Sequence, residues 1–167
     1  MNLIYYPNEF LDKKLDAVDI TSVDFNTYEL KYQMVELMIE HNGIGLSASQ
    51  VGINKQLFVM GNSRENCSLC INPQILQHTK DTVMDIEGCL SFPDVFVQVK
   101  RPKEVLVEYT DENLEQRRQH LTEYSARCFL HEYDHLQGIT FKDRATRLAW
   151  KMATKKVYKM NKHGHRH

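Results

Sequence analysis

The middle of the chain, residues 56–121, is a run of short segments with the composition of β-strands and no helical pattern between them. These segments are rich in β-branched and aromatic residues and are separated by Asn, Asp, Pro, Ser and Gly, which is typical of strands joined by turns. The predicted strands cover residues 56–60, 68–76, 82–87 and 95–101, followed by a hairpin over 104–121 that turns at 111–113. Strands joined by such short connections pair antiparallel. The centre of the fold is therefore predicted to be mostly antiparallel sheet.

Helical periodicity lies on both sides of this strand region. One helix is predicted over residues 21–43, with a capping signal at Thr21 and apolar side chains recurring every three or four positions. A second is predicted over residues 122–138, where Gly138 is placed to end it. Because helices flank the strands and do not alternate with them, the fold class is predicted to be α+β.

The composition is that of an ordinary globular chain. With 167 residues, 42% hydrophobic and 26% charged, the chain differs from disordered, collagen-like and membrane proteins. Its length suits one core, so we expect one domain over residues 1–142 and a basic helix or tail over 143–167. The apolar runs are too short to span a bilayer, and residues 1–10 lack the pattern of a secretory signal. We therefore expect a cytoplasmic protein without membrane association.

The stretch HEYDH, residues 131–135, places two histidines four positions apart on the second predicted helix. Residues four apart lie on the same helix face, so His131 and His135 can direct two imidazoles at one metal ion. Glu132 lies about 100° around the helix, where its carboxylate can reach a water at the metal without being a ligand. The alternative is that the motif arises by chance, since short motifs recur in unrelated chains.

Two histidines do not complete a metal site, and Cys89 is the best candidate for a third ligand. It follows the predicted strand 82–87, and Gly88 before it allows a close backbone approach. A lone cysteine is more commonly a small buried apolar residue. As a ligand, however, it would leave one tetrahedral position open, which is characteristic of catalytic sites.

The stretch NGIGLSASQVG, residues 42–52, superficially matches a dinucleotide-binding pattern of glycines. That pattern requires a preceding strand, and here a helix precedes it, so we reject a nucleotide site. Two interpretations stay open. The stretch could be an extended edge for a peptide, with the Gln50 amide donating to an oxyanion, or only a helix end and loop.

Three stretches together, GIGLSASQ, EGCLS and HEYDHLQG, closely resemble in order and separation the signature motifs of the peptide deformylase family. The resemblance extends over nearly all of residues 1–142. It implies an α+β metallohydrolase that removes the formyl group from the N-terminal formylmethionine of newly made chains. The family typically uses Fe²⁺, and the same ligands would also bind Zn²⁺, Ni²⁺ or Co²⁺.

The resemblance also assigns roles to individual residues. It implies that three residues bind the metal: Cys89, His131 and His135. It implies that Glu132 is the general base and then the acid, and that the Gln50 side chain and the Leu90 backbone N–H stabilise the oxyanion. Five residues are expected to contact substrate or shape its pocket: Gly43, Ile44, Gly45, Glu87 and Arg127. Glu87 is further expected to hydrogen-bond a ligand histidine.

Three positions depart from the family's usual pattern. Leu130 replaces the glutamine that commonly precedes the His-Glu pair, so one polar contact that anchors the helix is expected to be lost. Ser47 stands where alanine is usual, and its hydroxyl needs a polar partner. Arg127 lies one turn before His131 on the same helix face. Its guanidinium is expected either to extend outward over an apolar pocket or to reach into the pocket and alter side-chain preference.

The last 26 residues have a net positive charge, whereas the rest of the chain is net negative. Residues 142–167 hold nine Lys or Arg and one acidic residue, a net charge of +8, whereas the other 141 residues have 12 basic and 21 acidic side chains, a net charge of −9. The resemblance implies ribosome contact, with Lys151, Lys155, Lys156 and Lys159 touching RNA phosphates. The alternative is a solvated charged helix or a disordered end. We expect a monomer that acts on formylated nascent peptides and does not bind DNA.

Two rival functions share the histidine motif. A zinc peptidase would need a further ligand downstream, where the only histidines are His163, His165 and His167. A metal-stabilised binding module would need a closed fourth position, for which Cys128 is the only plausible thiol.

Overall fold

The structure is a computed structural model that describes residues 1–164, including the side chains as far as Val157 and that of Lys159. Its elements, in chain order, are the 3-10 helix η1 (Glu9–Asp12), α1 (Thr27–Glu40), β1 (Gly45–Ser47), the 3-10 helix η2 (Ala48–Val51), β2 (Leu57–Gly61), β3 (Cys67–His78), β4 (Thr82–Cys89), β5 (Phe92–Pro102), β6 (Glu104–Thr110), β7 (Gln116–Thr122), α2 (Glu123–Leu136), α3 (Phe141–Arg144) and α4 (Arg147–Gly164).

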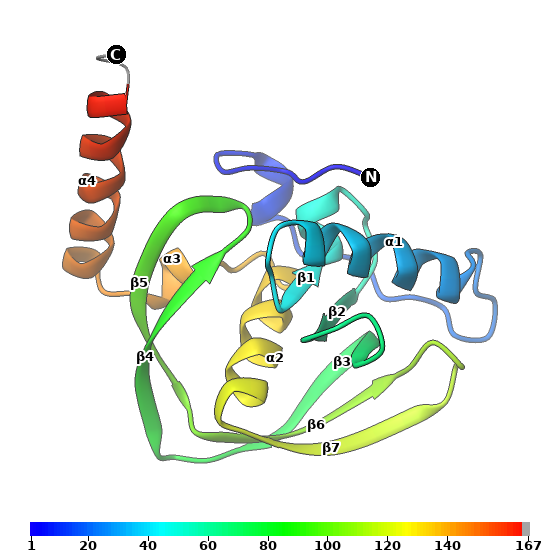
Figure 1. Cartoon of the computed structure of the whole chain (residues 1–167). Coiled ribbons are helices and arrows are strands. Elements are labelled where there is room, and N and C mark those ends of the chain that lie inside the picture. The colour runs from blue at the N-terminus through cyan, green and yellow to red at the C-terminus, as the bar shows by residue number, and fades with distance from the viewer. Residues whose placement is uncertain (165–167) are drawn as a thin grey trace.

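The strands form two antiparallel sheets. Five strands pair in the order β1-β2-β3-β6-β7, and β4 pairs with β5 in a long hairpin. Helix α2 lies between these two sheets and contacts strands of both (Figure 1). The predicted α+β class is therefore confirmed, and the predicted strands are present.

The main core forms where α2 meets the five-stranded sheet. Phe129 of α2 is fully buried and packs edge-to-face against Phe58 of β2, with ring centroids 5.1 Å apart. A smaller cluster covers the β4–β5 hairpin, where Phe92 packs against Phe141 of α3 and Trp150 of α4. Core residues occur along the whole length of α2, so the helix itself is held rigidly. The side chains on the face of α2 that does not pack in this core are therefore held in place too.

Helix α1 begins later than predicted. Its N-cap is Asn26, whose side chain accepts the Glu29 backbone N–H at 3.0 Å. Thr21 instead donates its hydroxyl to Asp19 within a turn. The predicted start at Thr21 was wrong because Asp19 caps a turn there and accepts both the backbone N–H and the hydroxyl of Thr21. The short elements η1, η2 and α3 were not predicted, and β1 lies in the stretch 42–52, for which an extended edge was one of two open interpretations.

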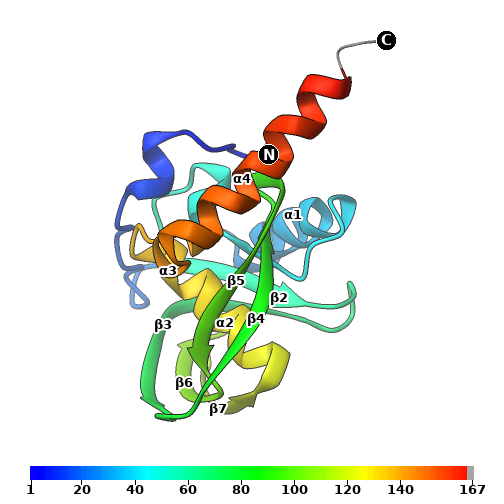
Figure 2. The same cartoon turned by 90° about the vertical axis from the view of Figure 1, so that its left-hand side faces the viewer.

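The basic segment is helical. Helix α4 packs on β5 through its buried Ala153 and then extends away from the body of the molecule (Figure 2). Among the described residues, no helix combines the length and the apolar character needed to cross a bilayer.

Candidate active site

Three side chains that could bind a metal ion meet between the two sheets. Cys89 ends β4, while His131 and His135 project from α2 one turn apart. One ligand atom from each of the three lies within 4.8 Å of the others. The Cys89 Sγ atom is 3.3 Å from His135 Nε2, and the two imidazole centroids are 5.1 Å apart. The structure thus brings together the three predicted ligands from two distant segments.

The free nitrogens of both histidines suit a metal ion. His131 Nδ1 donates to Glu87 Oε1 at 2.8 Å, which leaves its Nε2 lone pair for a ligand. His135 directs Nε2 toward Cys89, and its buried Nδ1 lacks a hydrogen-bond partner in the described region. A sulfur and two imidazole nitrogens are donors that suit transition metals and not Ca²⁺ or Mg²⁺. These residues therefore fit the ion that the motif predicts.

The site also favours positive charge in the metal-free chain. Burial lowers the pKa of His131, but its hydrogen bonds to Cys89 and Glu87 outweigh burial and raise this pKa to about 10. Burial, together with the His131 charge, holds the pKa of His135 well below its usual value. In the metal-free chain, the three side chains thus stabilise one positive charge, that of protonated His131. A cation bound there would replace this proton.

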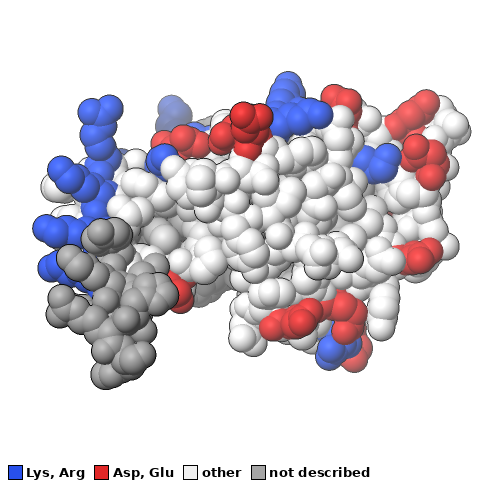
Figure 3. Space-filling view, turned by 90° about the horizontal axis from the view of Figure 1, so that it is seen from above, with Lys and Arg blue, Asp and Glu red and all other residues white. Residues whose placement is uncertain are grey.

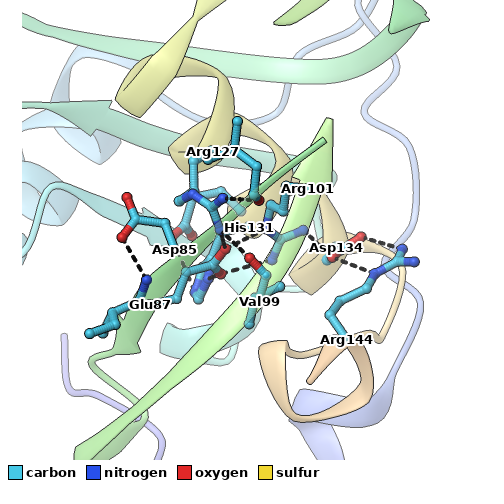
Figure 4. Close-up of polar contacts among 11 residues, drawn as sticks. Asp85, Glu87, Val99, Arg101, Arg127, His131, Asp134 and Arg144 are labelled. Carbon is cyan, nitrogen blue, oxygen red and sulfur yellow. Dashed lines mark hydrogen bonds and ion pairs between the residues drawn. The ribbon is translucent and has the colours of Figure 1, made fainter. Parts of the chain in front are cut away.

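Glu87 anchors His131 and is itself fully engaged (Figure 4). Its carboxylate also accepts two hydrogen bonds from Arg101, at 2.6 and 2.9 Å, and one from Arg127 at 2.6 Å. Burial raises the pKa of Glu87, but His131 and Arg101 lower it more, to about 2. Glu87 is therefore a carboxylate with donors on both oxygens, and its contact with His131 is held in place by two arginines.

The Glu87 interactions continue toward the C-terminal helices. Arg101 donates to Asp134 of α2 at 2.9 Å, and Arg144 of α3 donates two further hydrogen bonds to Asp134 at 2.9 and 3.0 Å (Figure 4). Asp134 thereby joins the α3 segment to the side chains behind the metal ligands.

Arg127 takes neither of the two predicted orientations. Its side chain is 10% exposed, so the guanidinium does not extend outward. It donates to Glu87, to the Val99 carbonyl at 2.8 Å and to the Val83 carbonyl at 2.7 Å. Although Arg127 borders the cavity, its donors are directed into the β4–β5 hairpin because that hairpin offers them a carboxylate and two carbonyls.

Glu132 lies beside the three ligands. It is buried, and its Oε1 is 3.9 Å from His131 Nε2. Its Oε2 is buried without a hydrogen-bond partner in the part of the chain that the structure describes. Burial raises the pKa of Glu132 to about 7, opposed by the charges of His131 and Arg101. A carboxyl with this pKa exchanges protons at neutral pH.

Gln50 and Leu90 lie next to Cys89, one of the three predicted metal ligands. Gln50 is buried on η2, and its Nε2 donates to Ser91 Oγ at 3.2 Å and approaches Cys89 Sγ at 3.5 Å. Leu90 directly follows Cys89 in the connection between β4 and β5 and lines the cavity. The structure thus places both predicted oxyanion donors next to the ligand cluster.

A cavity of about 560 Å³ opens in front of the cluster. Its lining includes Gly43, Ile44 and Gly45, from β1 and the residues before it, together with residues of α2 and of the β4–β5 hairpin. Strand β1 is an outer strand that pairs with β2, and within residues 1–164 no strand pairs with its other side. An extended peptide could therefore add to this edge through main-chain hydrogen bonds.

The rival metal sites are not favoured. Cys128 lies outside the ligand cluster, since its Sγ contacts the Ile44 carbonyl at 3.5 Å. The side chains of His163, His165 and His167 lie outside the described part of the structure.

Sequence analysis missed Arg101, Asp134 and Ser91 as parts of the site. Arg101 carried a signal, because it continues the alternation of the inward-facing Val97 and Val99 along β5. A charged residue at an inward position of a strand indicates a buried partner. Asp134 and Ser91 had no comparable signal. The contact of Asp134 depends on how α2 packs against β5, and that of Ser91 depends on how η2 approaches the connection between β4 and β5.

Comparisons with known proteins agree with this geometry. The family model described as "Polypeptide deformylase" matches residues 1–151. The chain is 44% identical over 132 residues to "Peptide deformylase 1" of a Nostoc species, covering 77% of this chain and 71% of that protein. It is 40% identical over 128 residues to a peptide deformylase of Thermotoga maritima, covering 77% of each.

A solved structure has the same fold. The crystal structure of a peptide deformylase from Synechococcus elongatus in complex with actinonin superposes with a TM-score of 0.85 at 39% identity, covering 93% of this chain and 84% of that one. Together with the family match over residues 1–151, this shows that the chain belongs to the polypeptide deformylase family.

Proposed function

We propose that this protein is a peptide deformylase, which hydrolyses the N-formyl group of formylmethionyl peptides and releases formate. The observation that carries the proposal is the placement of Glu132 beside Cys89, His131 and His135, in front of a cavity bordered by an unpaired strand edge. A hydrolytic centre next to a free edge suits an extended peptide whose end is the reacting group.

Binding would begin along β1. We infer that the substrate backbone pairs with the edge at Gly43, Ile44 and Gly45, and that the methionine side chain enters the cavity. The cavity wall is largely apolar there, with Ile86, Val95 and Phe96 among its lining residues. Glu87 and Arg127 would shape the inner end of the pocket while bonded to each other, so neither presents an unpaired charge to the methionine.

Cys89, His131 and His135 would hold one divalent metal ion, which would polarise the formyl carbonyl and lower the pKa of a water molecule. Glu132 would accept a proton from the attacking water and then deliver it to the departing amine nitrogen, a role that suits a pKa near neutrality. The Gln50 Nε2 and the Leu90 backbone N–H would donate to the oxyanion. Removal of one such donor typically lowers the rate about 100-fold.

The metal is proposed to be Fe²⁺. The half-buried Cys89 thiolate beside such an ion would make the enzyme sensitive to oxygen and peroxide. Activity that decays in air and is preserved under anaerobic conditions, or after replacement by Ni²⁺ or Zn²⁺, would support this choice. Equal decay of all three forms would contradict it.

The first test of the function is formate release from formyl-Met-Ala-Ser. Anaerobically purified protein is compared with Glu132→Gln at matched metal content. The parent is expected to release formate, and the variant is expected to retain the metal and lose activity. A metal-loaded parent that releases no formate would refute the proposal, and equal activity of both proteins would remove Glu132 from the mechanism.

The cytoplasmic location, the monomeric state and ribosome docking are further proposals. Basic side chains gather at the α4 end of the molecule (Figure 3), where Lys151, Lys155, Lys156 and Lys159 are exposed. Reversing the charge of Lys155 and Lys156 should weaken co-sedimentation with ribosomes, and salt should weaken that of the parent. The matched control reverses the exposed Lys13 and Lys14, which lie before α1. Equal binding by both variants would contradict docking through α4.

A further inference from the structure

The Gln50 amide is held at both ends. Its Oε1 accepts the Ser47 backbone N–H at 3.0 Å and the Ser47 hydroxyl at 3.1 Å. Its Nε2 donates to Ser91 Oγ at 3.2 Å and lies 3.5 Å from Cys89 Sγ. Ser47 and Ser91 are fully buried, so water does not compete for these contacts.

These contacts determine which end of the amide faces the ligand cluster. A reversed amide would direct its NH₂ group at the Ser47 N–H, placing two donors against each other. The Ser47 hydroxyl favours the same orientation of the amide, because it adds a second hydrogen-bond donor to the Gln50 Oε1 atom that already accepts the Ser47 backbone N–H.

We propose that Ser47 is a positioning residue that fixes Gln50 with its Nε2 facing the reacting carbonyl. The inference rests on the proposed function, in which Gln50 donates to the oxyanion. Ser47 acts only through Gln50, because its hydroxyl bonds that side chain and not the reacting atoms. A preorganised donor is worth more than one that must reorient during the reaction.

The first test is Ser47→Ala, measured with formyl-Met-Ala-Ser at matched metal content. Loss of one hydrogen bond to a buried carbonyl is expected to lower kcat about three- to ten-fold. KM and bound metal should be unchanged, because Ser47 contacts neither the cavity lining nor a ligand. The matched control is Ser49→Ala on the same 3-10 helix. Ser49 is also fully buried, but its hydroxyl donates to the Phe10 carbonyl at 3.4 Å, so its kcat should not fall.

A double-mutant cycle separates positioning from a general structural effect. In a Gln50→Ala background, Ser47→Ala should change kcat less than two-fold, because the side chain that it orients is gone. An equal fall in both backgrounds, or an unchanged kcat in the single variant, would overturn the inference.

A direct readout does not need activity. In protein labelled with ¹⁵N-glutamine, the Gln50 side-chain amide is assigned by its loss in Gln50→Ala. Ser47→Ala should shift this resonance and speed its proton exchange, whereas Ser49→Ala should not. An unmoved resonance would overturn the inference even if the parent were inactive, and an inactive parent with the expected shift would refute only the proposed function.

Discussion

Replacing Arg127 by leucine should destabilise the protein strongly. The guanidinium donates to the Glu87 carboxylate at 2.6 Å and to two main-chain carbonyls at 2.7 and 2.8 Å, with 10% of its side chain exposed. Breaking a buried ion pair costs about 3–5 kcal/mol. Glu87 keeps its bonds to Arg101 and His131, so the lower end of that range applies. In a chain of 167 residues, a loss of about 3 kcal/mol lowers Tm by roughly 6–12 °C.

The assay is thermal unfolding of metal-free protein, with Arg118→Leu as the control. Arg118 also pairs with a glutamate, Glu108, but at 3.8 Å and with 64% of its side chain exposed. An exposed pair is worth about 0–1 kcal/mol, so the control should lose no more than about 4 °C. An Arg127→Leu protein with the parent's Tm and an altered preference for the substrate's first side chain would refute the reasoning. It would mean that the guanidinium lies free in the pocket.

Three further predictions address strand β1, a distant turn and the metal. Gly45→Ala should lower kcat, because a Cβ there would lie 2.9 Å from both Cys128 Sγ and Glu132 Oε1 and displace the catalytic carboxylate; unchanged kinetics would contradict this. Burial raises the pKa of Asp111, but Arg117 and the Glu115 and Asn113 amides lower it more, so its folded-state pKa lies below 3.8. Its contribution to stability is therefore present above pH 3.8 and is lost as the pH falls through the folded pKa. Urea unfolding of Asp111→Asn should show a weaker dependence on acid than the parent. A chelator should abolish formate release and lower Tm, and both should return when a divalent metal is added; activity that survives complete metal removal would contradict the proposal.

The sequence predicted the parts of this fold that local patterns determine. Alternation located the strands, and the spacing of His131 and His135 located the catalytic helix because both are properties of one segment. The start of α1 was misplaced because Thr21 and Asn26 both carry capping side chains, and only packing decides between them. The orientation of Arg127 could not be predicted, since it depends on Glu87, Val83 and Val99, which approach α2 only in the folded chain.

The free edge of β1 has a cost for solubility as well as a use in binding. An unpaired strand edge can pair with the edge of another molecule, which is a common route to aggregation. Here the edge belongs to a strand of three residues, Gly45–Ser47, and short edge strands are one way in which proteins limit such pairing. A peptide that brings its own contacts with the cavity gains enough to bind there, whereas a second copy of the edge would gain only a few hydrogen bonds. Lengthening β1 would therefore favour self-association before it improved the binding of substrate.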